Sequence, residues 1–159
     1  MKKIVMLIVV SFLFSLNLNL TYAEIGKEIN SFENSQFVKK WGFKQFNEFE
    51  RGDKQIIKYK DNFNSVENVI EIEMNKDGTI TSELIMFSDN AAGGVYFMVL
   101  LEESSAHNIP TVEASKFVQE CMKLDGNKVI KKNKRFGNYD VIVYPPAGGY
   151  MAVKVKQYE

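Results

Sequence analysis

The side chains that most often carry out catalysis are few in this chain. His107 is its one histidine, and it stands in the polar connector SSAHNIP just before Pro110. A nucleophilic serine site would need that imidazole held by packing and a partner, yet the chain has neither a GxSxG nor an SxxK motif. We therefore predict that His107 is a surface side chain without a catalytic role.

Cys121 is the one cysteine, so an internal disulfide is excluded. It shares an apolar helical stripe with Ala114, Phe117, Val118 and Leu124, which predicts a buried and inert thiol. The alternative is a thiol dyad with His107. Because zinc needs three or four protein ligands, usually Cys or His, we expect no metal site, and nothing indicates a cofactor.

Two short motifs imitate known binding sequences. The string EMNKDGTI (residues 73–80) matches the first part of a calcium loop, but its first position is Glu73 and its twelfth is Leu84, where a bidentate Glu belongs. The string RGD (residues 51–53) spells an integrin-binding tripeptide. In both cases Gly and Asp between alternating segments predict a hairpin turn instead.

Basic residues are concentrated toward the C-terminus. Residues 128–156 carry seven basic side chains and one acidic one, Asp140, whereas residues 48–90 carry ten acids and five bases. If the last strands pair, these cations form one surface that could bind an anionic envelope polymer or an acidic protein face. The alternative is lysines that protect an edge strand from aggregation. The predicted binding residues are Lys128, Lys131, Lys132, Lys134, Arg135, Tyr139, Lys154 and Lys156.

The N-terminus has the pattern of a secretory signal peptide. Lys2 and Lys3 precede an apolar run over residues 4–16, and Thr21-Tyr22-Ala23 fits a cleavage site. A membrane anchor is disfavoured, because 13 helical residues span about 20 Å of a hydrocarbon core of roughly 30 Å. We predict cleavage after Ala23, an extracytoplasmic protein of residues 24–159 and no transmembrane segment after cleavage.

The exported chain has 18 basic and 20 acidic residues, and its net charge of −2 argues against nucleic-acid binding. Its length suits one domain. Hydrophobic spacing predicts a helix over residues 31–41, with Ser31 or Asn34 as N-cap and Gly42 at its end. Alternating residues predict an antiparallel meander of strands over residues 43–87.

The apolar run VYFMVLL (residues 95–101) fits either a buried strand or a helix, and we favour a helix over residues 91–106. A clearer helix begins at Thr111 and is predicted to end at Gly126. Strands are predicted over residues 128–135, 139–144 and 150–156. The order indicates an α+β fold in which two or three helices pack on one face of an antiparallel sheet, formed by a meander and C-terminal hairpins. The similarity between the segments SQFVKK (from Ser35) and SKFVQE (from Ser115) raises the hypothesis of an internal duplication.

Taken together, these features favour an exported, non-enzymatic binding or protein-interaction module of a bacterial envelope or secretome, with its sheet face and the PPAGG and RGDK loops as contacts. One alternative is a small enzyme that relies on carboxylates and tyrosines. Another is a domain that binds an apolar ligand, since aromatic residues make up 13% of the chain. An enzyme would need a carboxyl with a raised pKa in a cleft, and an apolar binder would need a cavity.

Overall fold

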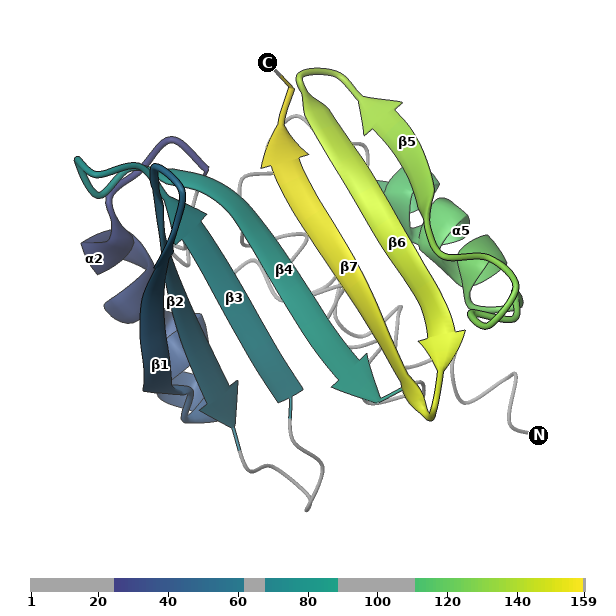
Figure 1. Ribbon diagram of the computed structural model, residues 1–159, viewed down its shortest axis with the longest axis horizontal. Coiled ribbons are helices and arrows are strands. Elements are labelled where there is room, and N and C mark those ends of the chain that lie inside the picture. The colour runs from purple at the N-terminus through teal and green to yellow at the C-terminus, as the bar shows by residue number, and fades with distance from the viewer. Residues whose placement is uncertain (1–24, 62–67, 89–110, 159) are drawn as a thin grey trace.

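The computed structural model describes residues 25–61, 68–88 and 111–158. These segments form one antiparallel sheet in the order β1-β2-β3-β4-β7-β6-β5, and the helices lie on one of its faces (Figure 1). The strands are β1 (Lys44–Arg51), β2 (Lys54–Asp61), β3 (Asn68–Met74), β4 (Ile80–Ser88), β5 (Lys132–Phe136), β6 (Tyr139–Ala147) and β7 (Tyr150–Gln157), and the helices are α2 (Ile29–Glu33), α3 (Gln36–Trp41) and α5 (Thr111–Cys121). The predicted α+β fold, with its meander and C-terminal hairpins, is confirmed.

Both motifs that imitate binding sequences are turns. Gly52, with φ of 65°, joins β1 to β2, and Gly78, with φ of 85°, lies in the turn from β3 to β4. Glycine suits these positions because it adopts positive φ without a steric penalty. In the second turn, Asp77 Oδ1 accepts a hydrogen bond from the Thr79 amide at 2.9 Å. Asp77 therefore serves the hairpin, as predicted from turn chemistry.

The helix predicted over residues 31–41 is two short helices, α2 and α3, separated at Ser35. Ser35, rather than Ser31 or Asn34, caps the second one: its buried Oγ accepts a hydrogen bond from the Val38 amide at 3.1 Å. Gly42 ends α3 with φ of 70°, as predicted. The break lets Phe32 on α2 and Val38 on α3 both reach the core.

Helix α5, which begins at Thr111 as predicted, is shorter than predicted. It ends at Cys121, and a turn follows before β5 begins at Lys132 rather than near Lys128. Ala114, Val118 and Cys121 are buried, which confirms the predicted apolar stripe. The helix predicted over residues 91–106 and His107 lie outside the described residues.

Buried apolar side chains from the meander (β1–β4) and from the C-terminal hairpins (β5–β7) share one core cluster between the sheet and the helices. Its centre is the pairing of β4 with β7, where Ile85 lies opposite Val153. Between α2 and β2, the Phe32 ring packs edge-on against Tyr59 at 5.0 Å between centroids, and the Tyr59 hydroxyl donates to Glu33 Oε1 at 2.8 Å. These contacts fix α2 on β2.

The hypothesis of an internal duplication stays a prediction. Val38 and Val118 of the two similar segments are both buried on helices that precede a group of strands. However, Ser35 caps α3 whereas Ser115 lies inside α5. The last strands of the two groups, β4 and β7, pair at the centre of the sheet.

Candidate functional site

The sheet face opposite α2, α3 and α5 is called the open face here, because no helix among the described residues covers it (Figure 1). Strand alternation and the pairing register decide which side chains belong to it. Its cations are Lys44, Arg51, Lys54, Lys58, Lys60, Arg135, Lys154 and Lys156. Its carboxylates are Glu71, Glu73 and Asp140. The described strands thus place eight cations and three carboxylates on a single face, an excess of five positive charges.

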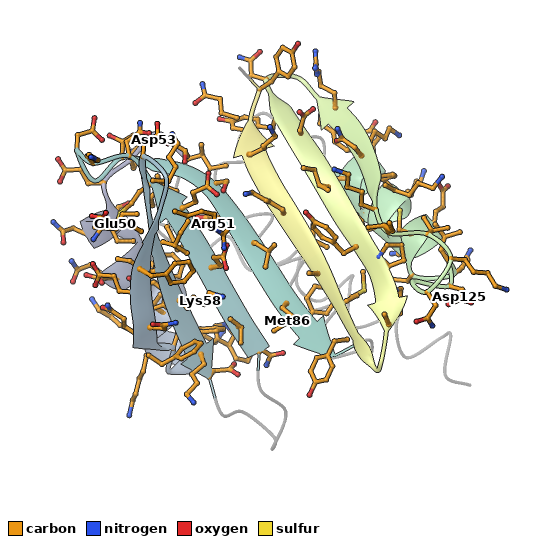
Figure 2. The ribbon with its side chains drawn as sticks, in the orientation of Figure 1. Glu50, Arg51, Asp53, Lys58, Met86 and Asp125 are labelled. Atoms are coloured by element: carbon orange, nitrogen blue, oxygen red, sulfur yellow. The ribbon has the colours of Figure 1, made fainter. Side chains whose placement is uncertain are left out.

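The three carboxylates of the open face are engaged by neighbouring cations. Glu71 contacts Lys58 at 3.0 Å and Arg51 at 3.5 Å, and Arg135 contacts Asp140 at 3.5 Å. Arg51 and Lys58 are labelled in Figure 2. Since each carboxylate is already neutralised, the remaining positive potential of the face is available to an anionic partner.

One of these ion pairs joins the two halves of the sheet. Lys154 Nζ on β7 donates to Glu73 Oε2 on β3 at 3.0 Å, across the intervening strand β4. Both side chains are about one-fifth exposed, at 19% and 20%. Partial burial reduces solvent screening, so this pair holds its geometry better than a fully exposed pair would.

An apolar row crosses one end of the open face. Four residues lie directly opposite one another on successive strands β3, β4, β7 and β6: Val69, Met86, Ala152 and Tyr144. Met86, which is labelled in Figure 2, is 37% exposed. Tyr150, two residues before Ala152 and next to the β6–β7 turn, is 44% exposed. At about 4.8 Å between strands, the row spans roughly 15 Å. The open face therefore combines an apolar row with a surrounding excess of cations.

The structure divides the eight binding residues predicted from sequence among three places. Arg135, Lys154 and Lys156 lie on the open face. Lys132 and Lys134 point to the opposite side, where Lys134 Nζ lies 5.8 Å from the Phe117 ring of α5. The others are Lys128 and Lys131, which precede β5, and Tyr139, which packs against the core.

Sequence reasoning missed the cations that β1 and β2 contribute to the open face. Arg51, Lys58 and Lys60 come from a segment counted as acidic, and they meet the C-terminal cations only because β4 pairs with β7. The alternation of Lys58 and Lys60 with Ile57 and Tyr59 was the available signal, since it places both lysines on one face.

Two buried groups with raised pKa values, Cys121 and Tyr59, have structural roles. Burial raises the pKa of the Cys121 thiol above its usual range, and Cys121 is 2% exposed, as predicted. Burial and the hydrogen bond to Glu33 raise the pKa of Tyr59 well above its usual range, so its hydroxyl stays protonated. Neither group is activated as a nucleophile.

Among the described residues, no group of three or more His, Cys, Asp or Glu side chains is placed to hold a metal ion. The same segments contain no helix long and apolar enough to cross a membrane. Comparison of the chain with family models, curated proteins and solved structures finds no match.

Proposed function

We propose that this protein is an exported, non-enzymatic binding module that holds an acidic protein partner on the open face of its sheet. The observation that carries this proposal is the excess of five positive charges on that face, in a chain whose formal net charge is zero. Charge of one sign gathered on one face steers an oppositely charged partner and favours its correct orientation.

The apolar row supports a protein as the partner. Met86, Ala152 and Tyr144 are still partly exposed, whereas Val69 is already buried. The three exposed members of the row need an apolar surface opposite them if binding is to remove them from water. A purely polar anionic polymer would leave this row uncovered, whereas protein interfaces combine an apolar centre with a charged rim. The partner that fits is an acidic protein with an apolar patch.

Two features of the sequence support the rest of the proposal. The basic start, apolar run and Thr21-Tyr22-Ala23 site at the N-terminus are typical of export. Binding rather than catalysis is favoured because the chain has a single histidine and a single cysteine, and Cys121 is buried with a raised thiol pKa. The RGDK and PPAGG loops lie at opposite ends of the sheet (Figure 1), so a partner on the open face would contact one of them more readily than both.

The test is affinity capture by the exported protein from its own cell envelope. We expect Lys60→Gln/Lys156→Gln to weaken capture of an acidic protein, because both lysines lie on the open face and neither is in an ion pair described above. Lys39→Gln/Lys40→Gln is the matched control, because it removes the same charge from the exposed side of α3. Capture by the parent should also decrease steeply as salt is raised.

A separate variant tests the apolar row. Met86→Gln keeps the size and flexibility of the side chain but removes its affinity for an apolar surface, and the residue is exposed enough for the fold to tolerate the change. Capture should weaken. If the control pair reduces capture as much as the open-face pair does, or if Met86→Gln has no effect, the partner binds elsewhere and the proposal is wrong.

A further inference from the structure

The connection between α5 and β5 exposes an apolar side chain among lysines. Ile130 is 82% exposed, the highest value for a large hydrophobic residue in the described segments, followed by Val112 at 57%. Lys128, Lys131 and Lys132 are its neighbours in the chain, and all three are exposed. Residues 125–132 are called the lysine loop below.

Hydrogen bonds hold the base of the lysine loop. The Asp125 carbonyl accepts from the amides of Lys128 and Val129 at 2.9 Å each, and Asp125 Oδ1 accepts from the Asn127 amide at 3.0 Å. The Gly126 amide donates to the Pro146 carbonyl on β6 at 3.0 Å. Ile130 therefore follows an ordered turn that is fixed to the sheet, and its exposure is a property of the fold.

The cations lie close enough to act together with Ile130. Cα atoms two residues apart are at most about 7.6 Å from each other, which is within the screening length of roughly 8 Å at physiological salt. Lys128 contacts Asp125 at 3.7 Å, but both side chains are exposed, and such pairs contribute little. Asp125 (Figure 2) is the one carboxylate of this loop.

We propose that the lysine loop docks on an anionic lipid surface, with Ile130 inserted at the level of the headgroups and the flanking lysines next to the phosphates. Lysine near an anionic bilayer is attracted to it, and an apolar side chain gains free energy by leaving water there. A soluble polyanion would satisfy the lysines but leave Ile130 in water. The combination of residues therefore favours lipid.

This inference stands on different residues from the proposed function. The lysine loop ends at Lys132, the first residue of edge strand β5, whereas the apolar row of the open face lies on β3, β4, β7 and β6. A protein docked through the loop could still present its open face to a partner. Loss of lipid binding and loss of partner capture can therefore be measured separately, and either proposal can fail alone.

The experiment is co-sedimentation of the exported protein with phosphatidylcholine vesicles, prepared with and without phosphatidylglycerol. We expect the parent to bind only the anionic vesicles. Lys131→Gln/Lys132→Gln should weaken that binding about 25-fold, or about five-fold for each lysine. Ile130→Ser should weaken it about ten-fold.

Matched controls keep the proposal open to refutation. Val112→Ser removes another exposed apolar residue, and Lys39→Gln/Lys40→Gln removes another lysine pair, so both should bind like the parent. The parent and all variants have the same N-terminal residues, so any contribution of these residues to vesicle binding is the same in every protein compared. Failure of the parent to bind anionic vesicles overturns the proposal. If the lysine pair matters while Ile130→Ser does not, the contact with the vesicles is purely electrostatic, and the proposed insertion of Ile130 among the headgroups is wrong.

Discussion

Gly126 offers a sharp test of the way the fold fixes the lysine loop. A Cβ atom at this position would lie 2.5 Å from the Pro145 carbonyl oxygen and 2.6 Å from the Pro146 carbonyl oxygen. Ordinary contacts of a Cβ begin at 3.4 Å, and both oxygens belong to the backbone of β6, which cannot turn away as a side chain can. Gly126→Ala must therefore push the loop off the strand.

The cost of Gly126→Ala can be estimated from three contributions. Overpacking against fixed atoms costs roughly 1–3 kcal/mol. The hydrogen bond from the Gly126 amide to the Pro146 carbonyl contributes about 1 kcal/mol and would be weakened. The lower backbone entropy of alanine in the unfolded chain offsets about 0.5–1 kcal/mol. We expect a net destabilisation of about 2 kcal/mol.

The measurement is urea denaturation of the parent and of Gly126→Ala, with Gly52→Ala as the control. Gly52 has φ of 65° but open space around its Cβ position, so its substitution reports backbone strain alone, about 1 kcal/mol. In thermal melts the change at Gly126 should lower the melting temperature by about 8 °C. Equal free energies of unfolding for the parent and Gly126→Ala would refute the close contact between the loop and β6.

Four further outcomes are expected. Cys121 should resist alkylation in the native protein, because it is 2% exposed and burial raises its thiol pKa. Rapid labelling at neutral pH would contradict this burial. Cys121→Ala should lower the free energy of unfolding by about 1 kcal/mol. Ser35→Ala should destabilise the protein by about 1 kcal/mol, because the buried Oγ caps α3; a change within error would mean that the cap is dispensable. The intact mass of the exported protein should correspond to a chain that begins at Glu24, whereas recovery of the full-length chain from membranes would exclude cleavage. Replacement of Lys131, Lys132 and Lys134 by Glu should abolish binding to anionic vesicles with little change in melting temperature, since exposed charges stabilise weakly; an unchanged affinity would leave these lysines only the role of edge protection.

Local features of the fold could be predicted because they depend on neighbours in the sequence. The turns at Gly52 and Gly78 follow from residues that adopt positive φ, and the end of α3 at Gly42 follows from the same property. The burial of Cys121 could be predicted from its spacing to Ala114 and Val118 on one helix. The boundaries of helices and strands were predicted less accurately. The break at Ser35 and the start of β5 at Lys132 depend on how each segment packs against the sheet.

The candidate site could be predicted only in part. The C-terminal cations were identified as a group because basic residues are concentrated in residues 128–156. Strand alternation, however, places Lys132 and Lys134 on one face of the sheet and Arg135 on the other. A pattern of period two divides every strand between two surfaces, so a count of charges along the chain mixes both of them. The cations of β1 and β2 were missed for the same reason.

The sequence by itself determined the alternation of side chains along each strand, the turn positions, the apolar stripe of α5 and the expectation of export. Tertiary structure alone decided that β4 pairs with β7, which brings Glu73 into contact with Lys154 and joins the cations of two distant segments on one face. The physical reason is that turns and helix caps are stabilised by nearby residues, whereas the choice of a strand partner depends on the packing of the whole core. Gly126 shows the same difference: its sequence position suggested a helix end, and only the fold shows that a carbonyl of β6 occupies the space of its missing side chain.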